Sequence, residues 1–147
     1  MLERRRFVVD TSVAMKWIVD EEDSDKAELL QAAEMVAPAL IRIEVGNVLR
    51  TLAAKQMLTD ECSIDLFLFL QTAPITIIDA DEFLERRAME LAVALRHPIN
   101  ACLYLALAER MDRFLITADL QFIEAICFTK HAHRVLSLKE LRPEAFK

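Results

Sequence analysis

Short apolar runs that alternate with longer amphipathic stretches constrain the fold of this chain more than any other feature of its sequence. The runs are rich in β-branched and aromatic residues, so they predict buried strands. The alternation predicts an α/β fold, with a central parallel β-sheet flanked by helices on both faces. We expect a single domain over residues 1–147, because this length suits one core. Strands are expected at residues 6–9, 35–38, 75–78, 113–117 and 135–138, and helices at 13–19, 24–34, 39–56, 81–95, 98–110 and 120–128. One more helix, capped by Thr59, is expected to contain residues 66–70 and to end before Pro74.

The composition excludes several classes of protein. With 54% hydrophobic residues, the chain is neither disordered nor of low complexity. It has one glycine, Gly46, and no GxGxxG or Walker pattern, which argues against a glycine-rich phosphate loop. Its net charge of -6 does not steer it toward nucleic acid, so any contact with RNA or DNA must depend on local basic groups or a metal ion.

The cysteines and the hydropathy predict a cytoplasmic protein. Cys62, Cys102 and Cys127 are odd in number and far apart, which fits reduced thiols better than a disulfide framework. Residues 3–6 lead into a strand and not into the apolar segment of a secretory signal. No apolar run approaches the ~20 residues that span a bilayer, so we expect no membrane association.

Two of the expected strands end in a carboxylate. Asp10 follows the first strand and Asp119 follows the fourth, so both should project from the same edge of a parallel sheet, where such folds bind ligands. Taken alone, Asp10 is better explained as a helix cap, with Thr11 and Ser12 offering further capping hydroxyls. The presence of Asp119 at the same edge favours the interpretation that Asp10 belongs to a ligand site.

A third acid, Glu44, lies inside the helix expected at residues 39–56. It shares one face with Leu40 and Val48, and a carboxylate on an apolar face is unfavourable unless a partner compensates it. A salt bridge with Arg42 or Arg50 is one explanation. The alternative is that Glu44 belongs to a metal site.

Three converging carboxylates would repel one another unless a cation lies among them. Hard oxygen ligands without paired histidines or cysteines indicate Mg²⁺ or Mn²⁺, and such a cluster suits metal-assisted hydrolysis of a phosphodiester. His97, His131 and His133 lack metal-ligand spacing, so we interpret them as surface or capping residues. Lys16 and Arg42 are close in sequence to a site acid and are candidate phosphate contacts, although ordinary surface cations explain them equally well.

Four segments in this order resemble a PIN-domain ribonuclease, and most of all the VapC toxins of type II toxin–antitoxin systems. They are Val-Val-Asp-Thr-Ser at residues 8–12, Pro-Ala-Leu-Ile-Arg-Ile-Glu-Val-Gly-Asn at 38–47, Tyr-Leu-Ala-Leu-Ala-Glu at 104–109 and Thr-Ala-Asp-Leu-Gln-Phe at 117–122. The resemblance covers nearly the whole chain. It implies a central parallel sheet, a Mg²⁺ or Mn²⁺ site, cleavage of RNA, a homodimer and a VapB-like antitoxin.

The resemblance also implies roles for individual residues. Asp10 and Asp119 match metal-binding acids of the family, and Glu44 matches the helix acid that commonly works through water. Ser12 and Thr117 match hydroxyl positions beside the metal. We therefore expect Asp10, Glu44 and Asp119 to line one metal pocket, with Ser12 and Thr117 beside the metal as substrate-binding residues.

One position departs from the family pattern. Members usually carry an acid three residues before the helix tyrosine, but here Ala101 precedes Tyr104 at that distance. Alanine has no ligand atom. Either the toxin is naturally degenerate, or an original aspartate was changed to alanine to disarm a toxic enzyme. We favour the second explanation, because the other acids are intact.

Other functions remain open at this point. A catalytically silent PIN module that only binds its antitoxin differs from the ribonuclease at Ala101. A receiver-like signalling domain would need acids where Thr11 and Ser12 stand, and a haloacid-dehalogenase-like phosphatase would need an Asp-x-Asp motif that Ser12 interrupts. Residues 66–70 are five consecutive apolar residues in an expected helix, which indicates contact with a second chain and supports the homodimer.

Overall fold

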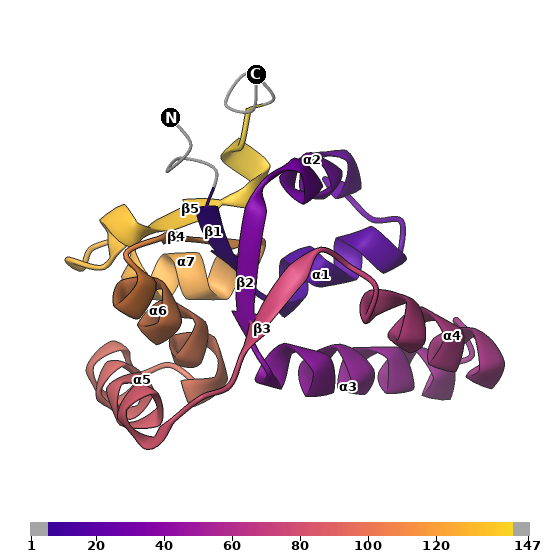
Figure 1. Ribbon diagram of the computed structural model, residues 1–147, viewed down its shortest axis with the longest axis horizontal. Helices are drawn as coiled ribbons and strands as arrows, with labels where there is room; N and C mark the ends of the chain where they lie inside the picture. Colours follow the sequence, from indigo (N-terminus) through magenta and orange to yellow (C-terminus); the bar gives the residue numbers. More distant parts are fainter. Residues whose placement is uncertain (1–5, 143–147) are drawn as a thin grey trace.

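The computed structural model describes residues 6–142, which form one five-stranded parallel sheet with α-helices on both faces (Figure 1). This confirms the predicted fold class. Residues 1–5 and 143–147, which the sequence assigns to the same domain, lie outside the described residues. The strand order is β3-β2-β1-β4-β5. The strands are β1 (Arg6–Val9), β2 (Glu34–Pro38), β3 (Ile75–Ile78), β4 (Phe114–Thr117) and β5 (Val135–Ser137).

The helices follow the expected pattern, with shifts at their ends. Thr59 caps its helix as expected, by accepting a hydrogen bond from the amide of Cys62 at 3.0 Å. The prediction of one helix over residues 24–34 is wrong. That helix ends at Leu29 and is followed by a 3-10 turn, because Glu34 already pairs with Arg6 in the sheet. The helices are α1 (Thr11–Ile18), α2 (Ser24–Leu29), α3 (Leu40–Ala54), α4 (Asp60–Leu70), α5 (Glu82–Leu95), α6 (Ile99–Met111) and α7 (Leu120–Ile126).

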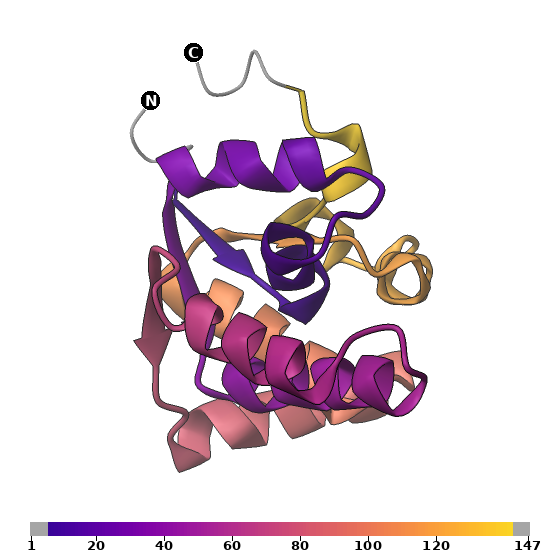
Figure 2. The same cartoon turned by 90° about the vertical axis from the view of Figure 1, so that its right-hand side faces the viewer.

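Successive residues of the central strand face opposite layers of helices. Val8 belongs to the larger core, which α3, α5 and α6 complete. Its neighbours Phe7 and Val9 belong to a second core, closed by Val13 of α1 and Leu30 after α2. Figures 1 and 2 show the two layers, with α3 and α4 side by side at one end of the molecule. Burial on both faces explains why the strand sequences are continuously apolar.

The direction of the chain reverses across the sheet at β1. The sequence proceeds from β1 to β2 and β3 on one side, and returns through α5 and α6 to β4 and β5 on the other. Such a switch point leaves a crevice outside the carboxyl ends of the two diverging strands, here β1 and β4. Asp10 and Asp119 follow these two strands directly.

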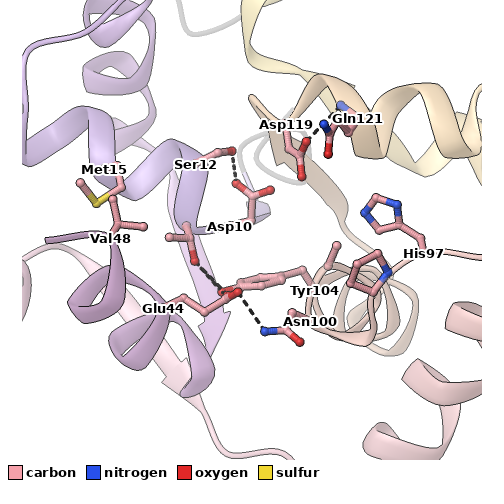
Figure 3. A pocket seen from close by; sticks show the side chains of 13 residues that line it. Asp10, Ser12, Met15, Glu44, Val48, His97, Asn100, Tyr104, Asp119 and Gln121 are labelled. Carbon is pink, nitrogen blue, oxygen red and sulfur yellow. Dashed lines mark hydrogen bonds between the residues drawn. The ribbon is translucent and has the colours of Figure 1, made fainter. Parts of the chain in front are cut away.

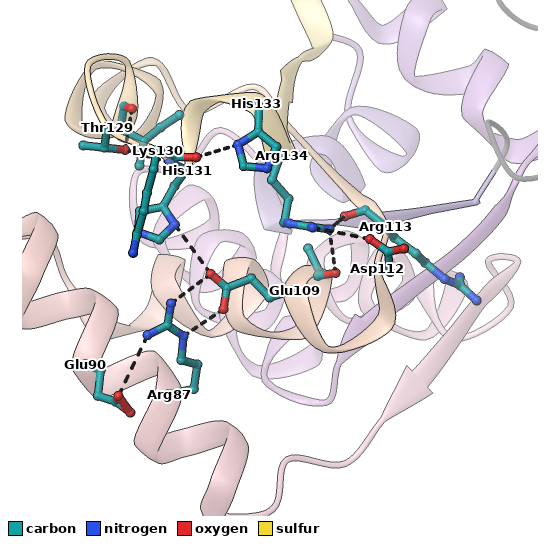
Figure 4. Close-up of polar contacts among 12 residues, drawn as sticks. Arg87, Glu90, Glu109, Asp112, Arg113, Thr129, Lys130, His131, His133 and Arg134 are labelled. Atoms are coloured by element: carbon teal, nitrogen blue, oxygen red, sulfur yellow. Dashed lines mark hydrogen bonds and ion pairs between the residues drawn. The ribbon is translucent and has the colours of Figure 1, made fainter.

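Helix α6 is fixed at its carboxyl end by charged side chains (Figure 4). Arg134 donates hydrogen bonds from Nη1 to the carbonyls of Ala108, at 3.3 Å, and Arg113, at 3.0 Å. Glu109 accepts two hydrogen bonds from Arg87 of α5, at 2.8 and 3.1 Å. Cationic groups are favourable at the negative end of the helix dipole. These contacts hold in place the helix that carries residue 101.

No single helix within residues 6–142 is long and apolar enough to cross a membrane, and α5 with α6 meets that test only as a pair bent by 119°.

Cys62, Cys102 and Cys127 are free thiols, in agreement with the expectation from their spacing.

Candidate active site

A pocket of 660 Å³ opens at the carboxyl ends of β1 and β4 (Figure 3). Asp10, Glu44 and Asp119 all line it, so three acids that are far apart in the sequence are brought to one cavity. No lysine or arginine of residues 6–142 lines this pocket. The remaining lining residues are Thr11, Ser12, Met15, Val48, His97, Pro98, Asn100, Ala101, Tyr104 and Gln121.

Asp10 is both a helix cap and a pocket residue. It is the N-cap of α1, and its Oδ1 accepts a hydrogen bond from the amide of Val13 at 3.3 Å. The expectation that Thr11 and Ser12 cap this helix is therefore wrong, since both belong to its first turn. The hydroxyl of Ser12 donates to Oδ1 at 2.5 Å, and that of Thr117 donates to Oδ2. Both carboxylate oxygens are thus held by hydroxyl groups.

The same two hydroxyls join the β1–α1 turn to the β4–α7 turn. Ser12 Oγ accepts a hydrogen bond from the amide of Ala118 at 2.8 Å, and Thr117 Oγ1 accepts one from the amide of Asp119 at 3.0 Å. Asp119 in turn caps α7, its Oδ1 accepting from the amides of Gln121, at 3.0 Å, and Phe122. The Asp10 and Asp119 carboxylates consequently face each other across the two turns (Figure 3).

Glu44 approaches from α3 and is held by a different set of donors. Its Oε1 accepts hydrogen bonds from Thr11, at 3.0 Å, and from the hydroxyl of Tyr104. Its Oε2 accepts a longer bond, of 3.4 Å, from the side-chain amide of Asn100. The salt bridge considered from the sequence does not form, and Arg50 instead donates to Asn47.

Without a cation, the surroundings of Asp10 disfavour its ionised form. Burial, and to a lesser extent the negative charge of Asp119, raise the pKa of Asp10 to about 6, against hydrogen bonds that lower it. Burial and the hydrogen bond to Glu44 raise the pKa of Tyr104 above its usual range, so its hydroxyl keeps its proton. A positive charge in this pocket would relieve the first of these shifts.

The donor chemistry fits a hard divalent cation, with Asp10 and Asp119 as the facing pair of carboxylates. No three acidic, histidine or cysteine side chains among residues 6–142 are close enough to hold one metal ion together. Glu44 is already engaged by three donors. The arrangement therefore fits an ion that keeps several of its waters better than an ion enclosed by three carboxylates.

Two predicted phosphate contacts are not at this site. Lys16 pairs with Glu21 at 3.2 Å and lines a separate pocket beside α2. Arg42 lines another cavity, with Leu70 and Ile75. The direction of the helices explains both cases. Residues two apart on a helix do not face the same side, so Arg42 points away from Glu44. Lys16 follows the N-cap residue Asp10 by six positions, which also places the two side chains on different sides of α1.

The sequence did not identify several polar residues of the pocket. His97 was expected to be a surface or capping residue, and it lines the pocket with its ring against that of Phe122, the centroids 5.1 Å apart. Asn100, Tyr104 and Gln121 also line it. For Tyr104 a signal existed, because a tyrosine on the apolar face of a helix needs a partner for its hydroxyl.

The chain matches the family model of the PIN domain over residues 7–126. It therefore belongs to the PIN-domain family, whose members are typically metal-dependent nucleases. This confirms the resemblance drawn from the four sequence segments. A comparison with curated protein sequences finds no match.

Among solved structures, the fold is similar to PAE2754 from Pyrobaculum aerophilum, with a TM-score of 0.68, 17% identity, and 92% of this chain and 85% of that chain covered. It is also similar to a toxin–antitoxin complex from Klebsiella pneumoniae, with a TM-score of 0.64, 17% identity and coverage of 91% and 98%. A third is VapC20 of Mycobacterium tuberculosis, a toxin that cleaves the sarcin–ricin loop, with a TM-score of 0.62, 14% identity and coverage of 82% and 95%. At these identities the likeness shows the fold.

Proposed function

We propose that this chain is a VapC-like toxin, a divalent-metal-dependent endoribonuclease in which Ala101 stands in place of an acid. The observation that supports this most is the pocket, lined by three carboxylates from β1, α3 and β4 and by no lysine or arginine of residues 6–142. An anionic RNA backbone enters such a pocket only with a cation. Membership of the PIN family and the likeness to toxin structures agree with this function.

In this proposal the residues of the pocket have different roles. Asp10 and Asp119 would hold Mg²⁺ or Mn²⁺, and such an ion would bind a phosphate oxygen of the RNA and lower the pKa of the attacking water. Ser12 and Thr117 fix the Asp10 carboxylate through their hydroxyls. Glu44 Oε2 has only the long bond from Asn100, so it is the oxygen that can accept a proton from the attacking water.

Ala101 lines the pocket one helical turn before Tyr104. An aspartate there would stand in the first turn of α6, where the helix dipole favours a carboxylate. We infer that it completes the set of acids, and that the chain with alanine is inactive or nearly so. A second function, a silent module that binds only its antitoxin, is supported by the lack of a three-ligand metal group among residues 6–142.

Replacing Ala101 by aspartate tests this proposal. We expect Ala101→Asp to cleave RNA with Mg²⁺ or Mn²⁺ and to lose that activity in EDTA. Without metal the variant should be less stable than the parent by about 1 kcal/mol, because it adds a like charge. Added metal should reduce or reverse this difference in stability, which thermal melts would measure.

Gln31→Glu, which adds one negative charge at an exposed position, is the matched control and should show neither effect. Cleavage that survives EDTA would contradict the metal mechanism. Failure of Ala101→Asp both to cleave RNA and to tighten Mn²⁺ binding would leave the silent module as the better explanation.

We further propose a homodimer and a VapB-like antitoxin as partners. Exposed apolar side chains are available on α3 and α4: Ile43 is 70% exposed, Ile64 60% and Phe69 58%. Gly46, Leu49 and Phe67 help to line a 460 Å³ groove between the same two helices. The antitoxin should bring a basic side chain, best an arginine, to the acidic pocket. A monomer in light scattering, with no partner recovered on co-expression, would contradict this.

A further inference from the structure

We propose that Tyr104 is a positioning residue, whose buried hydroxyl fixes the Glu44 carboxylate and leaves Oε2 for groups that enter the pocket. This role rests on the ribonuclease function proposed above and adds a residue to it. Tyr104 is the only tyrosine of the chain, and it is 2% exposed. Phenylalanine would fill the same space, so the hydroxyl itself needs an explanation.

The hydroxyl of Tyr104 makes polar contacts with two residues of the pocket. It donates to Glu44 Oε1 and lies 2.9 Å from Thr11 Oγ1. Thr11 also reaches Oε1, at 3.0 Å. Two hydroxyls therefore occupy one carboxylate oxygen, whereas the other has only the 3.4 Å bond from Asn100. This asymmetry distinguishes a positioned carboxylate from one that is merely buried.

The three groups come from three separate helices. Thr11 belongs to α1, Glu44 to α3 and Tyr104 to α6. Because Thr11 directly follows Asp10, the cluster sets the distance between Glu44 and the turn that holds Asp10. A free glutamate side chain samples many rotamers, and a carboxylate that acts on a bound water must be held in one of them.

Tyr104→Phe removes only the hydroxyl, and its effect should be seen in catalysis and in metal binding. In the Ala101→Asp protein, we expect kcat to fall about tenfold with KM changed by less than about twofold. In the chain as it stands, Mn²⁺ affinity measured by electron paramagnetic resonance should fall by about the same factor.

A double-mutant cycle separates positioning from a general structural effect. If Tyr104 acts through Glu44, Tyr104→Phe should change Mn²⁺ affinity less than about twofold in a Glu44→Ala background. A loss of equal size with and without Glu44 would overturn the role. Ser63→Ala is the matched control, because Ser63 is also buried and donates to the Thr59 carbonyl at 3.0 Å, away from the pocket. It should lower the melting temperature and leave kcat and Mn²⁺ affinity unchanged.

The failure of this role and the failure of the proposed function give different results. If the Ala101→Asp protein neither binds Mn²⁺ nor cleaves RNA, the ribonuclease function is overturned, and the role of Tyr104 with it. If that protein cleaves RNA and Tyr104→Phe cleaves as fast, only the role of Tyr104 is overturned.

Discussion

The buried surroundings of Asp10 disfavour the ionised form of its carboxyl group. Its pKa, raised to about 6 by burial, lies above the ordinary value of 3.8. The folded protein therefore binds a proton more tightly than the unfolded chain does, and the stability this gives is fully present below pH 3.8 and is lost as the pH rises to about 6. At neutral pH the ionised carboxylate destabilises the metal-free fold by an amount on the order of 2 kcal/mol, allowing for solvent screening.

We expect Asp10→Asn to stabilise the metal-free protein at neutral pH. The amide keeps an oxygen for the Val13 amide and carries no charge, so the free energy of unfolding at pH 7.5 should rise by about 1–2 kcal/mol. The gain should shrink as the pH is lowered toward 4, which urea unfolding in EDTA at several pH values would measure. Asp65→Asn, at an exposed position of α4, serves as the control. A gain that does not change with pH would contradict this account.

The single glycine of the chain affects the packing of two helices. Gly46 lies in the middle of α3, and a Cβ there would lie 3.5 and 3.7 Å from ring carbons of Phe67 on α4. These are ordinary van der Waals distances. The position therefore has room for a methyl group, and the glycine leaves the groove between α3 and α4 open.

Gly46→Ala should stabilise the protein by about 0.5–1 kcal/mol, because alanine loses less backbone entropy in a helix. The midpoint of urea unfolding measures this change. Ala53→Gly, on the same helix and the same groove, should have the opposite sign. If Gly46→Ala destabilises the fold, the ring of Phe67 does not accept the additional methyl group.

The sequence predicted elements better than it predicted side-chain directions. The positions of the strands follow from apolar runs, and the parallel sheet from their alternation with helices, so the common edge of Asp10 and Asp119 was predictable. The polar contacts of the pocket were not, because they join residues up to 107 positions apart, as in the bond from Thr117 to Asp10. Lys16 lies apart from the pocket although it is close to Asp10 in sequence, because closeness in sequence does not ensure closeness in space.

For the whole molecule, the net charge of -6 and the acidic pocket would govern an encounter with the proposed RNA substrate. A protein that contacts few phosphates with basic side chains releases few counterions, so its affinity depends weakly on salt. Divalent cations should matter more, because they offset the repulsion between the pocket and the RNA.

We expect the chain to bind a short single-stranded RNA measurably in Mn²⁺ and weakly in EDTA. The slope of log affinity against log monovalent salt should be about -2 or shallower, as measured by fluorescence anisotropy. Asp119→Asn should reduce the dependence on Mn²⁺, whereas Asp65→Asn should not. A steep salt slope in EDTA would indicate a basic RNA-binding surface outside the pocket.

The capping bonds of the two aspartates influence which losses this protein can tolerate over evolutionary time. Asp10 and Asp119 each hold backbone amides of the helix that they begin, so replacing either by a residue without a side-chain acceptor disturbs the scaffold as well as the chemistry. Position 101 lies in the first turn of α6 and has no capping role, since Pro98 is the N-cap residue. An acid at position 101 can therefore be lost while the fold and the surfaces of α3 and α4 are retained. Under the proposed function, a chain altered in this way would still bind the proposed antitoxin, and would compete for it with any active copy in the same cell.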